Sequence, residues 1–158
     1  MKVRLSYFYQ MRFFKPYMIP VSTALSDPVY YRPVDDKEYY YDKRGVVSGL
    51  RYEPMIVQAD GEVGCPCPLL KKGGETCEWR RQYRKLLETI DFDKMSKAFE
   101  FCGNKFKKEI GFEEEPMIVL MVYEAPDNPC SERAALIDYF NSHGIECEEL
   151  KYPIVENY

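Results

Sequence analysis

The residues best suited to chemistry lie together in one short turn, between Glu124 and Arg133. The turn follows an apolar run, Met117–Val122, and precedes a helical pattern that ends at Gly144. Cys130 would lie in or beside the first helical turn, where the helix dipole lowers the pKa of a thiol below its usual value of about 8.5. Cys130 is therefore a candidate nucleophile, with Glu124 as an acid or base and Arg133 as an anion ligand.

The same turn also has a purely structural interpretation. Asn128 or Ser131 would cap the helix, and Glu132 would complement its dipole. Arg133 would then pair with an acid, and the cysteine would be a small packed residue. Helix starts of this composition are common, so both interpretations stay open. The only histidine, His143, lies at the far end of the helix, so a cysteine–histidine catalytic pair is not expected.

A second group of chemical interest is a loop with three cysteines, Cys65, Cys67 and Cys77, which Cys102 could complete as a fourth ligand. Structural zinc sites use four ligands, usually from paired Cys-x2–4-Cys units. One Cys-x-Cys unit and a single later cysteine match that pattern only in part. Without a secretion signal we expect thiols or metal ligands rather than disulfides, and both bound zinc and free thiols remain open.

The third group is aromatic and basic and occupies the N-terminal part of the chain. Its members are Tyr7, Phe8, Tyr9, Phe13, Phe14, Tyr17, Tyr30, Tyr31, Tyr39, Tyr40 and Tyr41, interleaved with Arg4, Arg12, Lys15 and Arg32. Aromatic faces beside cations can stack the bases of a single strand, or hold one nucleotide-like ligand. The alternative is that many of these rings fill the core, because aromatic side chains are core residues first.

Hydrophobic periodicity predicts the elements that position these groups. They are strands at 3–8, 18–22 and within 45–57, helices at 77–90 and from Asp91 or Asp93 to about 110, a buried strand at 117–122, a helix ending at 144 and a strand at 145–150. Pro20 would place the second strand at an edge or a strand end. The last strand, helix and strand form a right-handed parallel βαβ unit. We therefore predict an α/β fold: a single layered, Rossmann-like domain over residues 1–158 with a long aromatic-rich N-terminal loop region.

Composition limits the classes of function. The chain has 158 residues, enough for one domain with an ordinary core, and its net charge of -4 argues against sequence-independent DNA binding. No apolar run approaches the ~20 residues that span a bilayer, and no signal-peptide core follows the N-terminus. We therefore expect a cytoplasmic protein without membrane partners.

Three separated motifs also occur in an informative order. They are Ser6-Tyr7-Phe8 with IPVS at 19–22 and the segment 26–31, the helix at 79–87 with Tyr83, and VLMVYE at 119–124 followed by Pro126, Cys130 and Arg133. In this order they resemble the bacterial and phage family numbered 488 among the domains of unknown function, over nearly the whole chain. Many members carry Cys-His-Arg after the Tyr-Glu strand end. Here Glu124 and Cys130 keep their places, Ser131 replaces the histidine, and Arg133 comes one residue later. The resemblance supports a site at Glu124–Arg133, but it names no reaction. Ser22, the last residue of the IPVS motif, is a further candidate ligand residue.

The leading hypothesis from the sequence is a ligand site over the strand ends. Cys130, Ser131 and Arg133 would bind an anionic group, such as a nucleotide or nucleic-acid phosphate. Tyr7, Tyr30 and Tyr31 would line the pocket. One alternative is single-stranded nucleic-acid binding through the basic aromatic N-terminal third, and another is a structural or interaction module held by zinc at Cys65, Cys67 and Cys77. The sequence leaves open whether the protein is an enzyme.

Overall fold

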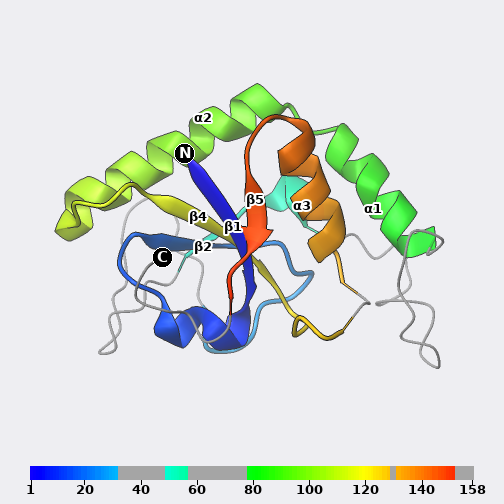
Figure 1. The fold of residues 1–158 in the computed structure, drawn as a ribbon, viewed down its shortest axis with the longest axis horizontal. Coiled ribbons are helices and arrows are strands. Elements are labelled where there is room, and N and C mark those ends of the chain that lie inside the picture. Colours follow the sequence, from blue (N-terminus) through cyan, green and yellow to red (C-terminus); the bar gives the residue numbers. More distant parts are fainter. Residues whose placement is uncertain (32–48, 57–77, 129–130, 152–158) are drawn as a thin grey trace.

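The computed structural model describes residues 1–31, 49–56, 78–128 and 131–151, which form an α/β fold around a five-stranded parallel sheet (Figure 1). The strands are β1 (Lys2–Tyr7), β2 (Met18–Ser22), β3 (Leu50–Arg51), β4 (Met117–Val122) and β5 (Cys147–Glu149), arranged in the order β3-β2-β4-β1-β5. All pairings are parallel. The carboxyl ends of the strands therefore lie along one edge, which we call the carboxyl edge and where open α/β sheets bind ligands.

The described helices include the three long ones that the pattern of the sequence predicts and two short ones, at 8–13 and 53–55, that it does not. They are η1 (Phe8–Phe13), η2 (Glu53–Met55), α1 (Glu78–Glu88), α2 (Phe92–Phe106), η3 (Lys107–Gly111) and α3 (Arg133–Ser142). In Figure 1 α2 runs along the top of the view and α1 lies beside α3, against which it packs. Asp91 caps α2 by accepting a hydrogen bond from the Lys94 amide (3.1 Å), and Gly144 ends α3 with a φ of 79°. None of the helices in the described ranges is long and apolar enough to cross a membrane.

β4 is the central strand of the core. All six of its residues are buried, as a continuous apolar run predicts. β4 pairs with β1 on one side, from Lys2 opposite Met117 onward, and with β2 on the other. β1 and β4 are neighbours, and the connections that leave their carboxyl ends run in opposite directions. The connection after β1 leads to β2, and the connection after β4 leads to β5. This is the topological switch point at which α/β folds usually place their sites.

The position of β2 corrects one expectation. Pro20 predicted an edge strand or a strand end, but β2 lies inside the sheet between β3 and β4. β3 pairs only with Val21 and Ser22, so Pro20 lies beyond that short ladder and needs no hydrogen bond to β3. At this point Gly49 approaches the Pro20 carbonyl so closely that the chain has no room for a side chain. Of the predicted N-terminal loop, residues 32–48 lie outside the described part of the chain.

Candidate functional site

The cysteines of both predicted sites, the turn before α3 and the cysteine-rich loop, lie outside the described part of the chain. They are Cys130 and the three loop cysteines Cys65, Cys67 and Cys77. Within the described ranges, no group of three or more histidine, cysteine, aspartate or glutamate side chains could hold a metal ion. Zinc binding and a nucleophilic cysteine therefore remain predictions from the sequence.

Arg133, a predicted anion ligand, uses all five of its N–H donors inside the protein. Nε and Nη2 donate to the two carboxylate oxygens of Glu149 (3.0 and 3.1 Å), and Nη2 also donates to the carbonyl of Glu124 (2.7 Å). Nη1 donates to the carbonyls of Ala125 (3.0 Å) and Asn128 (3.3 Å). A guanidinium has no sixth donor. Arg133 therefore ties the turn after β4 to β5, and in this structure none of its donors is left for an anion.

Ser131 is also engaged within the fold. Its side chain is buried and its hydroxyl accepts a hydrogen bond from the Arg133 amide (3.1 Å), as in the structural interpretation of the turn. Its carbonyl accepts a bond from Nη2 of the buried Arg80 (3.4 Å). The N-cap residue of α3 is Glu132, which makes no side-chain cap hydrogen bond, and the buried Ser131 just before it is held by these two internal contacts.

Ser22 and Tyr31, two other predicted ligand residues, are buried. The Ser22 hydroxyl donates to the Asp27 carboxylate and accepts a bond from the Ala24 amide (3.3 Å). The Tyr31 hydroxyl donates to the Leu50 carbonyl of β3. Both side chains are therefore engaged in internal hydrogen bonds that position the loop after β2.

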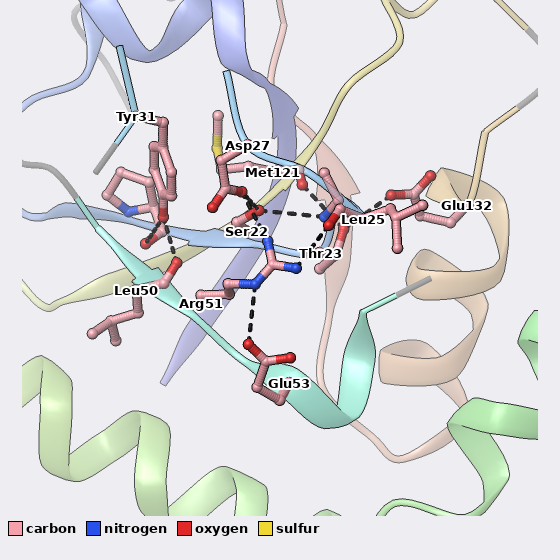
Figure 2. A network of polar contacts seen from close by, with 12 residues as sticks. Ser22, Thr23, Leu25, Asp27, Tyr31, Leu50, Arg51, Glu53, Met121 and Glu132 are labelled. Atoms are coloured by element: carbon pink, nitrogen blue, oxygen red, sulfur yellow. Dashed lines mark hydrogen bonds and ion pairs between the residues drawn. The ribbon is translucent and has the colours of Figure 1, made fainter. Parts of the chain in front are cut away.

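The loop after β2 is also fixed to β3 by an arginine, as Figure 2 shows. Arg51 pairs with Asp27 of the loop and with Glu53 beyond β3, each at 3.1 Å. Its Nη2 donates to the Leu25 carbonyl at 3.0 Å. With the hydrogen bonds of Ser22 and Tyr31, these contacts connect the loop at 23–31 to β3 at several points. The exposed side chains of this loop are therefore presented from a segment with many internal contacts.

Most of the exposed apolar side chains gather at the carboxyl edge. Seven large hydrophobic side chains are exposed in the described ranges: Tyr9, Phe13, Leu25, Val29, Tyr30, Phe101 and Tyr123. All but Phe101 lie in the segments that follow β1, β2 and β4. Large apolar groups kept in solvent on ordered segments are typical of binding sites. We call Tyr9, Phe13, Tyr30 and Tyr123 the aromatic surface; Leu25 and Val29 are exposed on the same segment as Tyr30.

Arg12 connects the parts of the aromatic surface. Its guanidinium lies 3.9 Å from the centre of the Tyr9 ring, and its Nε donates to the Tyr9 carbonyl (3.0 Å). Burial and the nearby Tyr123 raise the pKa of Tyr30, and the positive charge of Arg12 lowers it, so both Tyr123 and Arg12 lie within electrostatic reach of Tyr30. In the described part of the chain the two terminal nitrogens of Arg12 make no hydrogen bond. A cation whose terminal nitrogens have no hydrogen-bond partner among the described residues therefore lies beside exposed aromatic rings.

Reasoning from the sequence missed the importance of Glu132, to which it assigned only a dipole role. Glu132 is 3% exposed, and its Oε1 lies 3.1 Å from Oγ1 of Thr23, 109 residues away along the chain. Burial, and then the neighbouring Glu124 carboxylate, raise the pKa of Glu132 to about 8. No local pattern marks this residue, because its surroundings come from distant segments. Among the described residues, one buried carboxylate oxygen of Glu124 has no hydrogen-bond partner.

The described cysteines supply a reference for the reactivity predicted for Cys130. Burial raises the pKa of the Cys147 thiol to about 12, against the opposing charge of Arg4. In folded protein near neutral pH, we expect iodoacetamide to modify Cys130 far faster than Cys147, which should stay unmodified. Peptide mapping by mass spectrometry over time measures both rates. Equally slow alkylation of all cysteines would contradict a nucleophilic Cys130.

Comparisons with protein-family models, curated proteins and solved structures find no match to this chain. The resemblance to family 488 therefore rests on the order of the three sequence motifs and remains a prediction.

Proposed function

We propose that this protein binds a nucleotide-like ligand at its carboxyl edge, with the base on the aromatic surface and the phosphate at Arg12. The observation that carries the proposal is the gathering of exposed aromatic side chains around a cation whose terminal nitrogens have no hydrogen-bond partner among the described residues. Stacking of a base on an aromatic side chain contributes about 1–3 kcal/mol and tolerates any base, because every base has a π face. Arginine can bind a phosphate with two parallel hydrogen bonds.

The support beneath the aromatic surface also favours a ligand site. Exposed rings lose contact with water when a ligand stacks on them, and the gain is larger when the rings are already held in place. Tyr30 lies on the loop fixed by Arg51 and Asp27, and Tyr123 packs edge-on against the ring of Phe8 (5.8 Å). The site therefore needs little ordering on binding.

The proposal moves the anion away from the turn predicted from the sequence while keeping that turn next to the ligand. Arg133 and Ser131 are engaged in internal hydrogen bonds, so the phosphate is assigned to Arg12. Glu124 follows Tyr123 directly and is half-buried beside the aromatic surface. In the proposal its carboxylate accepts a hydrogen bond from the ligand.

A second candidate is the binding of single-stranded nucleic acid. The ring of Tyr9 stacks against Tyr7 at 6.2 Å and meets Phe13 edge-on at 6.5 Å, so the rings continue along η1 beyond the size of one base. A strand would occupy several rings, and its affinity would fall as salt rises. The affinity for a single nucleotide would depend on fewer rings and would change less with the salt concentration.

Replacement of the exposed tyrosines tests the proposal. We expect Tyr30→Ala and Tyr123→Ala each to weaken the binding of adenosine monophosphate about tenfold, the loss of one stacking contact of about 1.4 kcal/mol. Arg12→Gln should weaken the binding of adenosine monophosphate. It should leave the affinity for adenosine, which has no phosphate, almost unchanged. Isothermal titration calorimetry at low salt measures these affinities, and an oligothymidine of ten residues tests the second candidate.

Phe101→Ala is the matched control, because Phe101 is exposed on α2 away from the aromatic surface. Its replacement should leave binding unchanged. Stronger binding of the oligothymidine than of the nucleotide, with steep salt dependence, would favour the second candidate. No binding of either ligand at low salt, or an equal loss in Phe101→Ala, would contradict both.

A further inference from the structure

We propose that Glu132 is a proton-binding site, and that its bound proton keeps closed the junction where β2, β4 and α3 meet. At this junction Thr23 follows β2, Met121 belongs to β4, and Glu132 precedes α3 (Figure 2). The Thr23 hydroxyl oxygen lies 3.0 Å from the Met121 carbonyl and 3.1 Å from Oε1 of Glu132. The site goes beyond nucleotide binding and does not depend on it.

The number of protons available at the junction favours a protonated Glu132. A threonine hydroxyl has one proton, and a carbonyl oxygen can only accept a hydrogen bond. If Thr23 donates to Met121, its contact with Glu132 is a hydrogen bond only when the carboxyl group of Glu132 supplies the proton. If Glu132 is ionised, the single proton of Thr23 can serve one neighbour but not both. The protonated acid is therefore the form that satisfies both contacts.

The surroundings of the carboxyl group favour the same form. Glu132 is buried, and ionising it would place a charge in a site with little water. Among neighbouring groups, the Glu124 carboxylate after β4 opposes ionisation. Hydrogen bonds from the Glu132 amide and from Thr23 favour it, as does the charge of Arg133 on α3, which is already bonded to Glu149. From α1, the buried Tyr83 faces Glu132, and Arg80 donates to the Ser131 carbonyl. The combined effect raises the pKa of Glu132 to about 8.

The junction connects the segments that carry the aromatic surface. The Thr23 amide also donates to the Met121 carbonyl (3.1 Å), so Thr23 binds β4 through two atoms. Thr23 begins the loop that carries Leu25 and Tyr30, and Tyr123 follows two residues after Met121. Ionisation of Glu132 would draw the Thr23 proton away from Met121 and draw water toward the new charge. The junction, and with it the spacing of the two exposed tyrosines, therefore loosens as the proton leaves.

The direction of the pH dependence follows from the raised pKa of Glu132. The folded protein holds this proton from the ordinary value of 4.5 up to about 8, whereas the unfolded chain releases it near 4.5. The stabilisation is complete below 4.5 and is lost as the pH rises toward 8. Over that interval the single proton bound by Glu132 should make the ratio of folded to unfolded protein fall about tenfold per pH unit.

Glu132→Gln is the decisive variant, because the glutamine amide can donate to Thr23 as the protonated acid does and cannot ionise. Chemical denaturation between pH 5 and pH 9 should show that the variant has lost the one-proton slope of the wild type. Glu88→Gln, at an exposed position of α1, is the control and should keep the slope. Thr23→Val should weaken the fold at pH 5, whereas Thr23→Ser should not.

A direct titration keeps the proposal testable even if a variant fails to fold. Carboxyl ¹³C spectra of wild-type protein labelled at glutamate should contain one resonance that titrates near pH 8, and Glu132→Gln should lack it. Titration of every glutamate below about pH 6 would overturn the proposal, as would an unchanged slope in Glu132→Gln. Because no ligand is used, failure of the nucleotide proposal would leave this result unaffected.

Discussion

Arg133→Met should lower the free energy of unfolding by about 3 kcal/mol, since breaking a largely buried ion pair leaves a charge without its partner. The side chain of Arg133 is 11% exposed and that of Glu149 is 22% exposed. The variant would lose both bonds to Glu149 and three bonds to carbonyls of the turn after β4. Urea denaturation without any ligand measures this loss.

The same variant separates the two interpretations of the turn. If Arg133 is a structural clamp, its loss reduces stability in the absence of ligand. If it instead served an anion, Arg133→Met would reduce affinity and leave the stability of the free protein almost unchanged. The Glu149→Gln variant, combined with Arg133→Met in a double-mutant cycle, measures the coupling between the two side chains.

Arg81→Met is the matched control for this experiment. Arg81 makes a short ion pair with Glu78 on α1 (2.8 Å), but both side chains are more than half exposed, at 58% and 59%. Such a pair contributes about 0.3–0.5 kcal/mol. Equal losses in Arg81→Met and Arg133→Met would show that Arg133 does not hold the turn to β5.

Gly49→Ala should destabilise the protein by about 3 kcal/mol, at the upper end of the usual cost of overpacking. A Cβ atom at Gly49 would lie 1.9 Å from the carbonyl oxygen of Pro20. The backbone of Gly49 and the backbone of Pro20 cannot move apart without separating β3 from β2. That separation would disturb the contacts of Leu50 with Tyr31 and of Arg51 with Asp27. Thermal unfolding measures the loss, and hydrogen exchange should show reduced protection confined to β2, β3 and the loop after β2.

Gly111→Ala is the control for Gly49→Ala, because the two glycines are needed for different reasons. Gly111 has a φ of 85° and no atom within 4 Å of the position a Cβ would take. Alanine there strains the backbone by about 1 kcal/mol without a collision. A loss in Gly49→Ala no larger than in Gly111→Ala, or no change in β3 protection, would contradict the close approach of the two strands.

Much of the architecture follows from local pattern. The unbroken apolar run at Met117–Val122 predicted a strand covered on both faces, and all six residues are buried. Asp91 and Gly144 marked the start of one helix and the end of another through their own backbone chemistry. The C-terminal βαβ unit could be predicted from the spacing of its strands and helix alone. Such features are local, so they can be predicted without knowing which segments meet.

The order of the strands could not be predicted in the same way. β4 lies between β1 and β2 in the sheet, although β1 and β2 are consecutive strands in the sequence. Only the packing of all five strands decides which neighbours bury the most apolar surface. The expectation that Pro20 marks an edge failed for this reason, since it took no account of how short β3 would be.

For the candidate site, the sequence by itself predicted a place and a set of residue types: a strand end, a turn and a helix start carrying acids, an arginine and a serine, near a segment rich in tyrosine. The tertiary structure decided which of these side chains are free. It turns Arg133, Ser131, Ser22 and Tyr31 inward and leaves Tyr9, Tyr30, Tyr123 and Arg12 in solvent. It also buries Glu132 against Thr23, from the other end of the chain. Whether a polar group is available depends on partners brought together by folding, and those partners are distant in sequence.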